Sequence, residues 1–203
     1  MGKHSVDISV LGMDLAARHS GLCYIPKEWD GTQGGLICRE IGYNLKGKLD
    51  ERTKIQIMLN VAKTALAMVH EFKPDRVVVE DYAFSRQSSS TTMQAEIGGV
   101  IRSQIYLSTN ITVEPLSVTG ARKFLTGGLR GKRSADASRG IRCLGAKEQV
   151  KKFLANRGIV FDTEDIMDAF VVAYYRYCKL NGTLCSFRPI AEHEQTKEVR
   201  RGG

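Results

Sequence analysis

Short runs of apolar residues near the N-terminus predict β-strands. Residues 8–15 ("ISVLGMDL") and 20–26 ("SGLCYIP") are apolar runs separated by a short polar break, and residues 34–44 ("GGLICREIGYN") alternate apolar with polar side chains. Runs of this length and period are typical of strands. The pattern predicts three neighbouring strands joined by tight connections.

The period changes after Asp50, which we expect to cap a helix. Apolar side chains then recur at spacings of three and four residues: Ile55, Met58, Leu59, Ala62, Leu66, Val69 and Phe72. This spacing indicates one long amphipathic helix. Lys73 and Pro74 end it, and "DRVVVE" (75–80) is a short apolar run of the kind found in central parallel strands. A helix followed by such a strand predicts a crossover connection.

The second half of the chain repeats this alternation. Five apolar residues at helical spacing predict a second long helix: Met93, Ile97, Val100, Ile101 and Ile105. The next strand is expected over 110–118, and three more helices are expected at about 119–127, 147–157 and 163–180. Strands that alternate with helices are typical of the α/β class.

Length and composition add limits to this picture. With 203 residues the chain can bury one substantial core, so we expect a single domain over 1–187, with a glycine-rich basic loop at about 127–146 and a polar tail over 188–203. No apolar run approaches the roughly 18–20 residues of a membrane helix, and no signal-peptide layout is present. We therefore expect a cytoplasmic protein with no membrane partner. Five scattered cysteines without a Cys-x-x-Cys pair predict reduced thiols.

The positive charge is concentrated in one segment. Residues 120–152 hold ten Lys or Arg residues against two acids, a net charge of +8, and the rest of the chain sums to zero. Clustered basic residues are typical of surfaces that contact phosphates, although a solvated basic loop is the simpler alternative. The candidate phosphate-contacting residues of this segment are Arg122, Lys123, Arg130, Lys132, Arg133, Arg139, Arg142 and Lys151.

Four acidic residues lie where an acid needs a partner. Asp14 lies in the first strand and Glu80 ends a later one, and these two meet if their strands are neighbours. Asp165 and Asp168 are three residues apart, which places them on one face of a helix. Helix capping could explain Asp165, but it explains Asp168 less well because that residue lies deeper in the helix.

Four convergent carboxylates repel each other unless a cation lies between them. Ligand sets made only of oxygen atoms select Mg²⁺ or Mn²⁺, and two such ions can support phosphodiester cleavage. Each acid alone has a plausible structural role, whereas the ordered set favours a metal-dependent nuclease.

The same residues carry a resemblance to a known family. The stretches "ISVLGMDLAARHSGLCYI", "PDRVVVEDYAF", "TTMQAEIGGVI", "VTGARKFLTG", "GAKEQVKKFL" and "DIMDAFVVAYY" resemble, in order, the blocks of the RuvC family of Holliday-junction resolvases, within the ribonuclease H-like superfamily. The similarity covers about residues 7–178.

The resemblance implies a ribonuclease H-like fold, with a mixed five-stranded sheet flanked by helices, and a homodimer that cuts branched DNA in recombination and repair. It places the family's four metal-binding acids on Asp14, Glu80, Asp165 and Asp168. It places a basic catalytic residue on Lys147. Two Mg²⁺ ions per site are implied, and Mn²⁺ can substitute.

Some positions depart from the family pattern. The family's Asp-Pro-Gly turn is here Asp14-Leu15-Ala16, and the aromatic residue expected three positions after Glu80 is Ala83. Tyr82 and Phe84 flank that position, so either could enter the junction, and Arg86 belongs to the same segment. Residues 128–144 form a basic insertion, which resembles phage or viral members and would place the protein in a host cytoplasm.

The sequence therefore predicts a crossover junction endodeoxyribonuclease. A flap, fork or RNA–DNA hybrid nuclease of the same fold would keep the same acids. A non-catalytic junction-binding architectural protein would keep the basic segment without needing all four acids. An actin-like ATP-binding protein is disfavoured because a second glycine-rich phosphate loop is missing. The branch-migration partner and the cleavage-sequence preference stay undecided.

Overall fold

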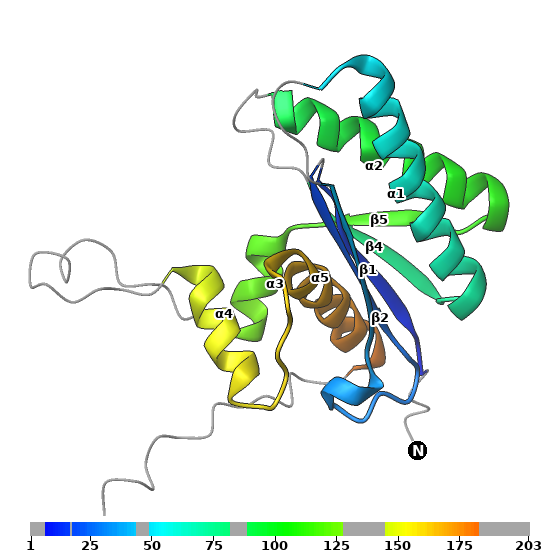
Figure 1. The fold of residues 1–203 in the computed structure, drawn as a ribbon. Helices are drawn as coiled ribbons and strands as arrows, with labels where there is room; N and C mark the ends of the chain where they lie inside the picture. The colour runs from blue at the N-terminus through cyan, green and yellow to red at the C-terminus, as the bar shows by residue number, and fades with distance from the viewer. Residues whose placement is uncertain (1–6, 17, 44–48, 82–88, 128–144, 183–203) are drawn as a thin grey trace, which may run out of the picture.

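The fold is built on one twisted sheet, shown in Figure 1. A computed structural model describes residues 7–16, 18–43, 49–81, 89–127 and 145–182, with side chains of the second long helix described from Thr92 onward. The strands lie in the order β3-β2-β1-β4-β5. Their bounds are β1 Val10–Asp14, β2 His19–Ile25, β3 Ile37–Gly42, β4 Arg76–Glu80 and β5 Val113–Leu116.

The sheet mixes antiparallel and parallel pairs. The first three strands form an antiparallel meander, in which β1 pairs with β2 and β2 with β3. Strand β1 also pairs in parallel with β4, and β4 in parallel with β5. The predicted mixed five-stranded sheet is confirmed, and the run at 75–80 is a central strand as its apolar composition indicates.

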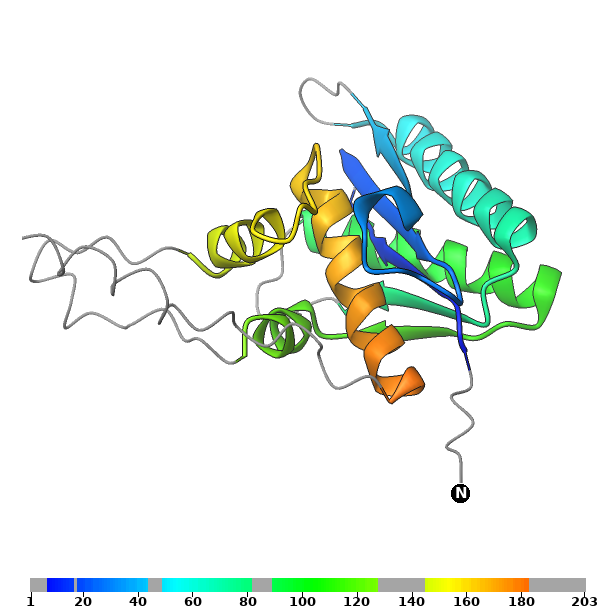
Figure 2. The same cartoon turned by 90° about the horizontal axis from the view of Figure 1, so that it is seen from below.

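Helices cover both faces of this sheet (Figures 1 and 2). Helices α1 and α2 pack on each other and cover one face, whereas α3 and α5 cover the other, with α4 beside α3. Their bounds are α1 Glu51–Phe72, α2 Ser89–Thr109, α3 Val118–Leu125, α4 Ala146–Ala155 and α5 Glu164–Asn181; a short 3₁₀ turn, Gln33–Gly35, precedes β3.

The alternation of side chains along each strand divides the core into two layers. In β1, Leu11 and Met13 belong to the layer under α1 and α2, whereas Val10 belongs to the layer under α5. Because side chains alternate between faces, Asp14 follows Val10 toward the α5 side. The same parity in β4 directs Glu80, like Val78, toward α5. Both acids therefore face the helix that carries the other two.

The apolar row predicted for α1 is partly wrong. Ile55 and Leu59 are 52% and 54% exposed, and the buried side of the helix includes Ile57, Val61 and Ala65 instead. Both rows have helical spacing, so periodicity alone does not choose between them. The two rows share Ala62 and Val69, which are both buried, so the prediction is wrong in where the buried side extends and not in every residue. The expected cap is confirmed, since the Asp50 side chain accepts a hydrogen bond from the Thr53 N–H at 2.7 Å.

Helix α5 lies directly on β1 and β2, and glycine makes this approach possible. A Cβ atom added to Gly12 would lie 2.2 Å from the Ala169 carbonyl oxygen and 2.7 Å from the Ala173 Cβ atom. No side chain fits at Gly12 unless the helix moves away. This close packing of α5 on the sheet carries Asp165 and Asp168 toward the strands that carry Asp14 and Glu80.

Other sequence predictions fall partly outside the described residues. Cys23, Cys38 and Cys178 are free thiols, as expected, although the sulfur atoms of Cys23 and Cys38 lie only 3.1 Å apart across β2 and β3. Within the described ranges, every helix is too short or too polar to cross a membrane. Most of the basic loop at 127–146 and all of the tail at 188–203 lie outside those ranges, so the domain boundaries stay predictions.

Candidate active site

Asp14 and Glu80 meet at the carboxyl ends of two neighbouring parallel strands. Each is the last residue of its strand, and the pairing of Met13 with Val79 sets them side by side. The Asp14 carboxyl group donates a hydrogen bond to the Glu80 carboxylate. Sharing a proton in this way is expected when two acids are close and poorly solvated.

Burial has a large effect on this pair. Asp14 is only 9% exposed, and burial, followed by the negative charge and hydrogen bond of Glu80, raises the pKa of Asp14 to about 9. Burial also raises the pKa of Glu80, by more than the hydrogen bond from Asp14 and the nearby cations lower it. The charges of Asp165 and Asp168 raise the pKa of Asp14 further. Burial and the neighbouring acids therefore both disfavour the ionised form of Asp14, and a bound cation would favour it.

The turn after Asp14 is fixed by a serine. The Ser20 hydroxyl accepts a hydrogen bond from the Ala16 N–H at 3.1 Å and donates one to the Ala16 carbonyl oxygen at 3.0 Å. This buried hydroxyl closes the connection between β1 and β2 at the point where the family pattern has proline and glycine. Although Leu15 and Ala16 replace that proline and glycine, Asp14 is still the last residue of β1.

Asp168 is the most deeply buried of the four acids. It is 1% exposed and lies in the second turn of α5, beyond the Thr163 cap. Arg122 of α3 holds both of its oxygens, with Nε donating to Oδ1 at 3.0 Å and Nη2 to Oδ2 at 2.5 Å. The Lys147 ammonium lies 3.1 Å from the same Oδ2. Two cations therefore balance this single buried carboxylate.

Lys147 also joins α4 to the start of α5. Its Nζ donates to Glu164 Oε2 at 3.0 Å. Burial acts to lower the pKa of Lys147, but its hydrogen bonds and ion pairs with Glu164 and Asp168 outweigh this effect and raise it. The lysine is thus held in its charged form beside the acids, at the position that the sequence predicts for it.

Asp165 lies one turn before Asp168 and is half-buried. Burial raises its pKa, and the positive charges of His19 and Lys147 oppose this effect. A Cβ atom added to Gly21 in β2 would lie 2.2 Å from the Asp165 carbonyl group, so the first turn of α5 lies directly over this strand. The four predicted acids thus converge, from β1, β4 and two turns of α5.

The structure gives Arg122 a contact that the sequence analysis missed. The residue was grouped with the basic segment as a contact for DNA phosphates, whereas its guanidinium group is bound to Asp168 and its side chain is 15% exposed. The available signal was Asp168 itself, since a carboxylate deep in an apolar helix face needs a buried cation. The sequence could not say which of ten basic residues supplies it.

The other candidate DNA-binding residues are placed only in part. Lys123 of α3 and Lys151 of α4 are exposed. The remaining predicted contacts lie outside the described residues: Tyr82, Phe84, Arg86, Arg130, Lys132, Arg133, Arg139 and Arg142.

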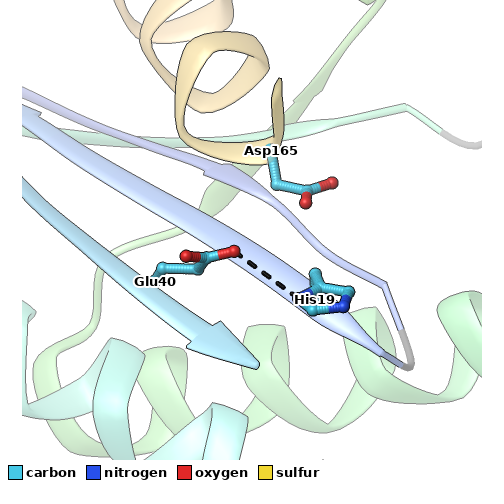
Figure 3. A group of neighbouring side chains, drawn as sticks. All are labelled: His19, Glu40 and Asp165. Atoms are coloured by element: carbon cyan, nitrogen blue, oxygen red, sulfur yellow. Dashed lines mark ion pairs between the residues drawn. The ribbon is translucent and has the colours of Figure 1, made fainter. Parts of the chain in front are cut away.

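A second group of ligating side chains lies beside Asp165. In the part of the chain that the structure describes, the potential metal-ligand atoms of His19, Glu40 and Asp165 all lie within 4.8 Å of one another. The three residues come from β2, β3 and α5 (Figure 3). The sequence analysis missed His19 and Glu40, because their proximity depends on the register between β2 and β3, which the sequence does not state.

Comparisons with known proteins identify the fold. No protein-family model and no curated protein sequence matches the chain. Among solved structures, Thermus thermophilus RuvC superposes with a TM-score of 0.58 at 19% identity, over 87% of this chain and 98% of that one. This chain has the RuvC fold.

Two further structures support this assignment. Thermus thermophilus RuvC in complex with a Holliday junction substrate matches with a TM-score of 0.59 at 14% identity, over 87% of this chain and 97% of that one. The yeast mitochondrial Holliday junction resolvase matches with a TM-score of 0.54 at 14% identity, over 88% and 82%. The expected ribonuclease H-like α/β fold is confirmed, and the chain spans nearly the whole length of the RuvC structures.

Proposed function

We propose that this chain is a metal-dependent endonuclease that cleaves phosphodiester bonds in four-way and other branched DNA. The observation that carries the proposal is the convergence of Asp14, Glu80, Asp165 and Asp168 at one edge of the sheet, with Arg122 and Lys147 beside them. The fold shared with RuvC, one structure of which holds a Holliday junction substrate, supports the choice of substrate.

The donor set fits Mg²⁺. Carboxylate oxygens from four residues meet in a site where burial, and then the neighbouring acids, raise the pKa of Asp14, and hard divalent cations prefer such ligands. Asp14, Glu80, Asp165 and Asp168 would hold the metal, and Mn²⁺ would be accepted as well. When bound, two such ions activate water and stabilise the leaving oxygen of the phosphodiester.

The residues of the chain would divide the remaining work. Asp14, which is buried, and Glu80, which is half-buried, lie at the ends of strands, which would fix the orientation of their oxygens. Lys147, held in its charged form, would stabilise negative charge that develops on the scissile phosphate. Arg122, which donates to both oxygens of Asp168, would hold that carboxylate in its orientation. The products would carry 5′-phosphate and 3′-hydroxyl ends.

Affinity for DNA would come mainly from the basic segment. Lys123 and Lys151 are exposed on α3 and α4, on the side of the sheet that carries the four acids. Together with Arg130, Lys132, Arg133, Arg139 and Arg142, they would contact backbone phosphates. Tyr82, Phe84 and Arg86 follow Glu80 directly in the sequence and would contact DNA near the cleaved strand.

Symmetric cleavage of a four-way junction requires two copies of the chain, because one chain holds one site. The resemblance to the RuvC family makes the helix over 91–107 the expected dimer face, and its apolar residues Met93, Ile97, Ile101 and Ile105 are buried within this chain. A dimer through α2 would therefore use its outer side, where Tyr106 and Leu107 are exposed. Sedimentation analysis of the purified protein, alone and with a junction, tests the predicted homodimer.

A cleavage assay tests the proposal. Labelled four-way junction, fork, flap and linear duplex are incubated with the purified protein in Mg²⁺ or in chelator. We expect Mg²⁺-dependent cleavage of branched substrates, with the four-way junction preferred. Junction binding without any cleavage would instead support an architectural protein, and preferential cleavage of flaps, forks or hybrids would identify a different nuclease of the same fold.

Two substitutions test the site assignment. Asp14→Asn and Asp168→Asn are expected to abolish cleavage and to leave junction binding largely intact. Asp162→Asn, which removes an exposed acid just before α5, is the matched control and is expected to cleave normally. Retained cleavage in either active-site variant would contradict the assigned roles.

A further inference from the structure

His19, Glu40 and Asp165 form a group of polar side chains where β2 and β3 pass under the start of α5. The register pairs His19 with Gly42 and Gly21 with Glu40. His19 and Glu40 are thus diagonal neighbours on one face of the strand pair. A glycine stands opposite each of them, and Asp165 lies over that face (Figure 3).

The two glycines leave the space that the group occupies. A Cβ atom at Gly21 would overlap the Asp165 backbone, 2.2 Å from its carbonyl carbon and oxygen. A Cβ atom at Gly42 would lie 3.1 Å from Nδ1 and 3.4 Å from Cε1 of the His19 ring. Larger residues would move α5 away or displace the imidazole, so the backbone permits His19, Glu40 and Asp165 to come together.

The spacing of the donor atoms matches that of a small tetrahedral metal site. His19 Nδ1 and Glu40 Oε1 are 3.5 Å apart. Two ligands bound to zinc at about 2.0–2.1 Å in tetrahedral geometry are roughly 3.3 Å apart. The Asp165 ligand atom lies within 4.8 Å of both, and rotation of its half-buried side chain can close that gap.

The donor types select the class of metal. Imidazole nitrogen favours zinc and similar transition metals, whereas Mg²⁺ prefers oxygen ligands and keeps its water. One histidine and two carboxylates leave a fourth position for water, as in open zinc sites. The side chains of His19 and Glu40 are 54% and 32% exposed, so an ion can enter from solvent.

We propose that His19, Glu40 and Asp165 form a binding site for a divalent transition-metal ion of the zinc class, beside the oxygen-only set of Asp14, Glu80, Asp165 and Asp168. The two sets share Asp165. An ion held by His19 and Glu40 draws the Asp165 carboxylate toward β2 and β3. Zinc-class ions would therefore inhibit Mg²⁺-dependent cleavage.

The binding itself does not depend on the proposed nuclease function; only the inhibition rests on it. Binding is measured on the full-length protein with Zn²⁺ by titration calorimetry in excess Mg²⁺, and with Co²⁺ by visible absorption. We expect His19→Gln to weaken binding of the ion by at least about tenfold, since even second-shell losses cost that much. His70→Gln is the matched control, because His70 is exposed on α1.

The results distinguish a site at His19, Glu40 and Asp165 from binding elsewhere. If His19→Gln binds Zn²⁺ as tightly as the wild type does, the proposed site is wrong. It is also wrong if the Co²⁺ complex shows thiolate charge-transfer absorption that persists in His19→Gln, because the ion would then be bound by cysteine. Glu40→Gln supplies a second variant with the same expected loss, and circular dichroism confirms that each variant is folded. In cleavage assays, His19→Gln should resist inhibition by Zn²⁺. If no condition gives cleavage but Zn²⁺ binding depends on His19, the proposed function fails and the metal site stands.

Discussion

Asp168 shows how positive side chains offset the negative charge of a buried acid in this site. Its carboxylate is 1% exposed, yet both oxygens are bound by Arg122, and Lys147 adds a second positive charge. A buried ion pair contributes little net stability, but removing one partner leaves a buried charge without compensation. Arg122 is therefore a structural requirement of Asp168 whatever else it does.

Replacing Arg122 tests this dependence. We expect Arg122→Gln to lower the free energy of unfolding by about 3 kcal/mol, at the lower end for broken buried pairs because Lys147 remains. For a domain of this size, this corresponds to a fall in Tm of roughly 6–12 °C. Lys123→Gln, an exposed neighbour on the same helix, should change Tm little. A similar Tm for both variants in a thermal unfolding experiment would show that the pair is dispensable.

Replacing Asp14 is expected to stabilise the fold, in contrast to replacing Arg122. The pKa of Asp14 is raised from 3.8 to about 9 in the folded protein, so the folded state binds a proton more tightly than the unfolded chain. The stability from this group is complete below pH 4 and is lost as the pH rises toward 9. Asp14→Asn removes this loss, since its neutral amide does not ionise.

Thermal unfolding of the metal-free protein at about pH 6 and pH 8.5 measures this linkage. We expect Asp14→Asn to have the higher Tm, by a margin that widens with pH and corresponds to at least about 1 kcal/mol, or roughly 2–4 °C, at the upper pH. Mg²⁺ should stabilise the wild type more at the higher pH, because it binds the ionised acids. A constant or reversed difference between the two proteins would contradict the raised pKa of Asp14.

At the scale of the elements, the sequence correctly predicted which helices and strands form and in what order. The alternation in residues 34–44, the apolar run ending in Glu80 and the cap at Asp50 each correspond to an observed feature. These are local signals, because strand period, chain reversal and capping are decided within a few residues.

What the sequence did not predict depends on contacts between elements. The buried side of α1 was misassigned at Ile55 and Leu59, because two apolar rows share the helical period and only the packing partner decides between them. The pairing of Arg122 with Asp168 joins α3 to α5, and the proximity of His19 and Glu40 depends on strand register. The four acids could be predicted to lie together because each has a recognisable position in its own element.

The packing of α5 on β1 gives a prediction at this scale. Gly12→Ala places a methyl group 2.2 Å from the Ala169 carbonyl oxygen, so we expect overpacking to cost about 3 kcal/mol or more. Gly99→Ala is the matched control, because a Cβ atom there meets nothing within 4 Å and alanine is favoured over glycine in a helix by about 1 kcal/mol. Unfolding in urea should show Gly12→Ala destabilised and Gly99→Ala stabilised; equal midpoints would place α5 farther from the sheet.

At the scale of the whole molecule, the net positive charge is concentrated in one segment of the sequence. Residues 120–152 carry the net charge of +8, and the remaining residues sum to zero. Helices α3 and α4, which begin and end this segment, lie on the α5 side of the sheet, where the four acids converge. The described basic residues of this segment, Lys123 and Lys151 among them, therefore lie on the same side of the sheet as the four acids, an arrangement that suits the proposed cleavage of a polyanion.

The salt dependence of junction binding measures this arrangement. Each phosphate neutralised by Lys or Arg contributes about 0.9 to the slope of log K against log salt on duplex DNA. We expect simultaneous replacement of Arg130, Lys132 and Arg133 by Gln to weaken junction binding at low salt and to reduce the slope by roughly 2–3.

The matched control replaces the same number of exposed basic residues elsewhere in the chain: Lys63, Lys73 and Arg76. Lys73 and Arg76 lie at the end of the sheet opposite Glu80, so their loss should leave the slope unchanged. Equal slopes for the two triple variants would mean that overall charge, and not the basic segment, attracts the DNA.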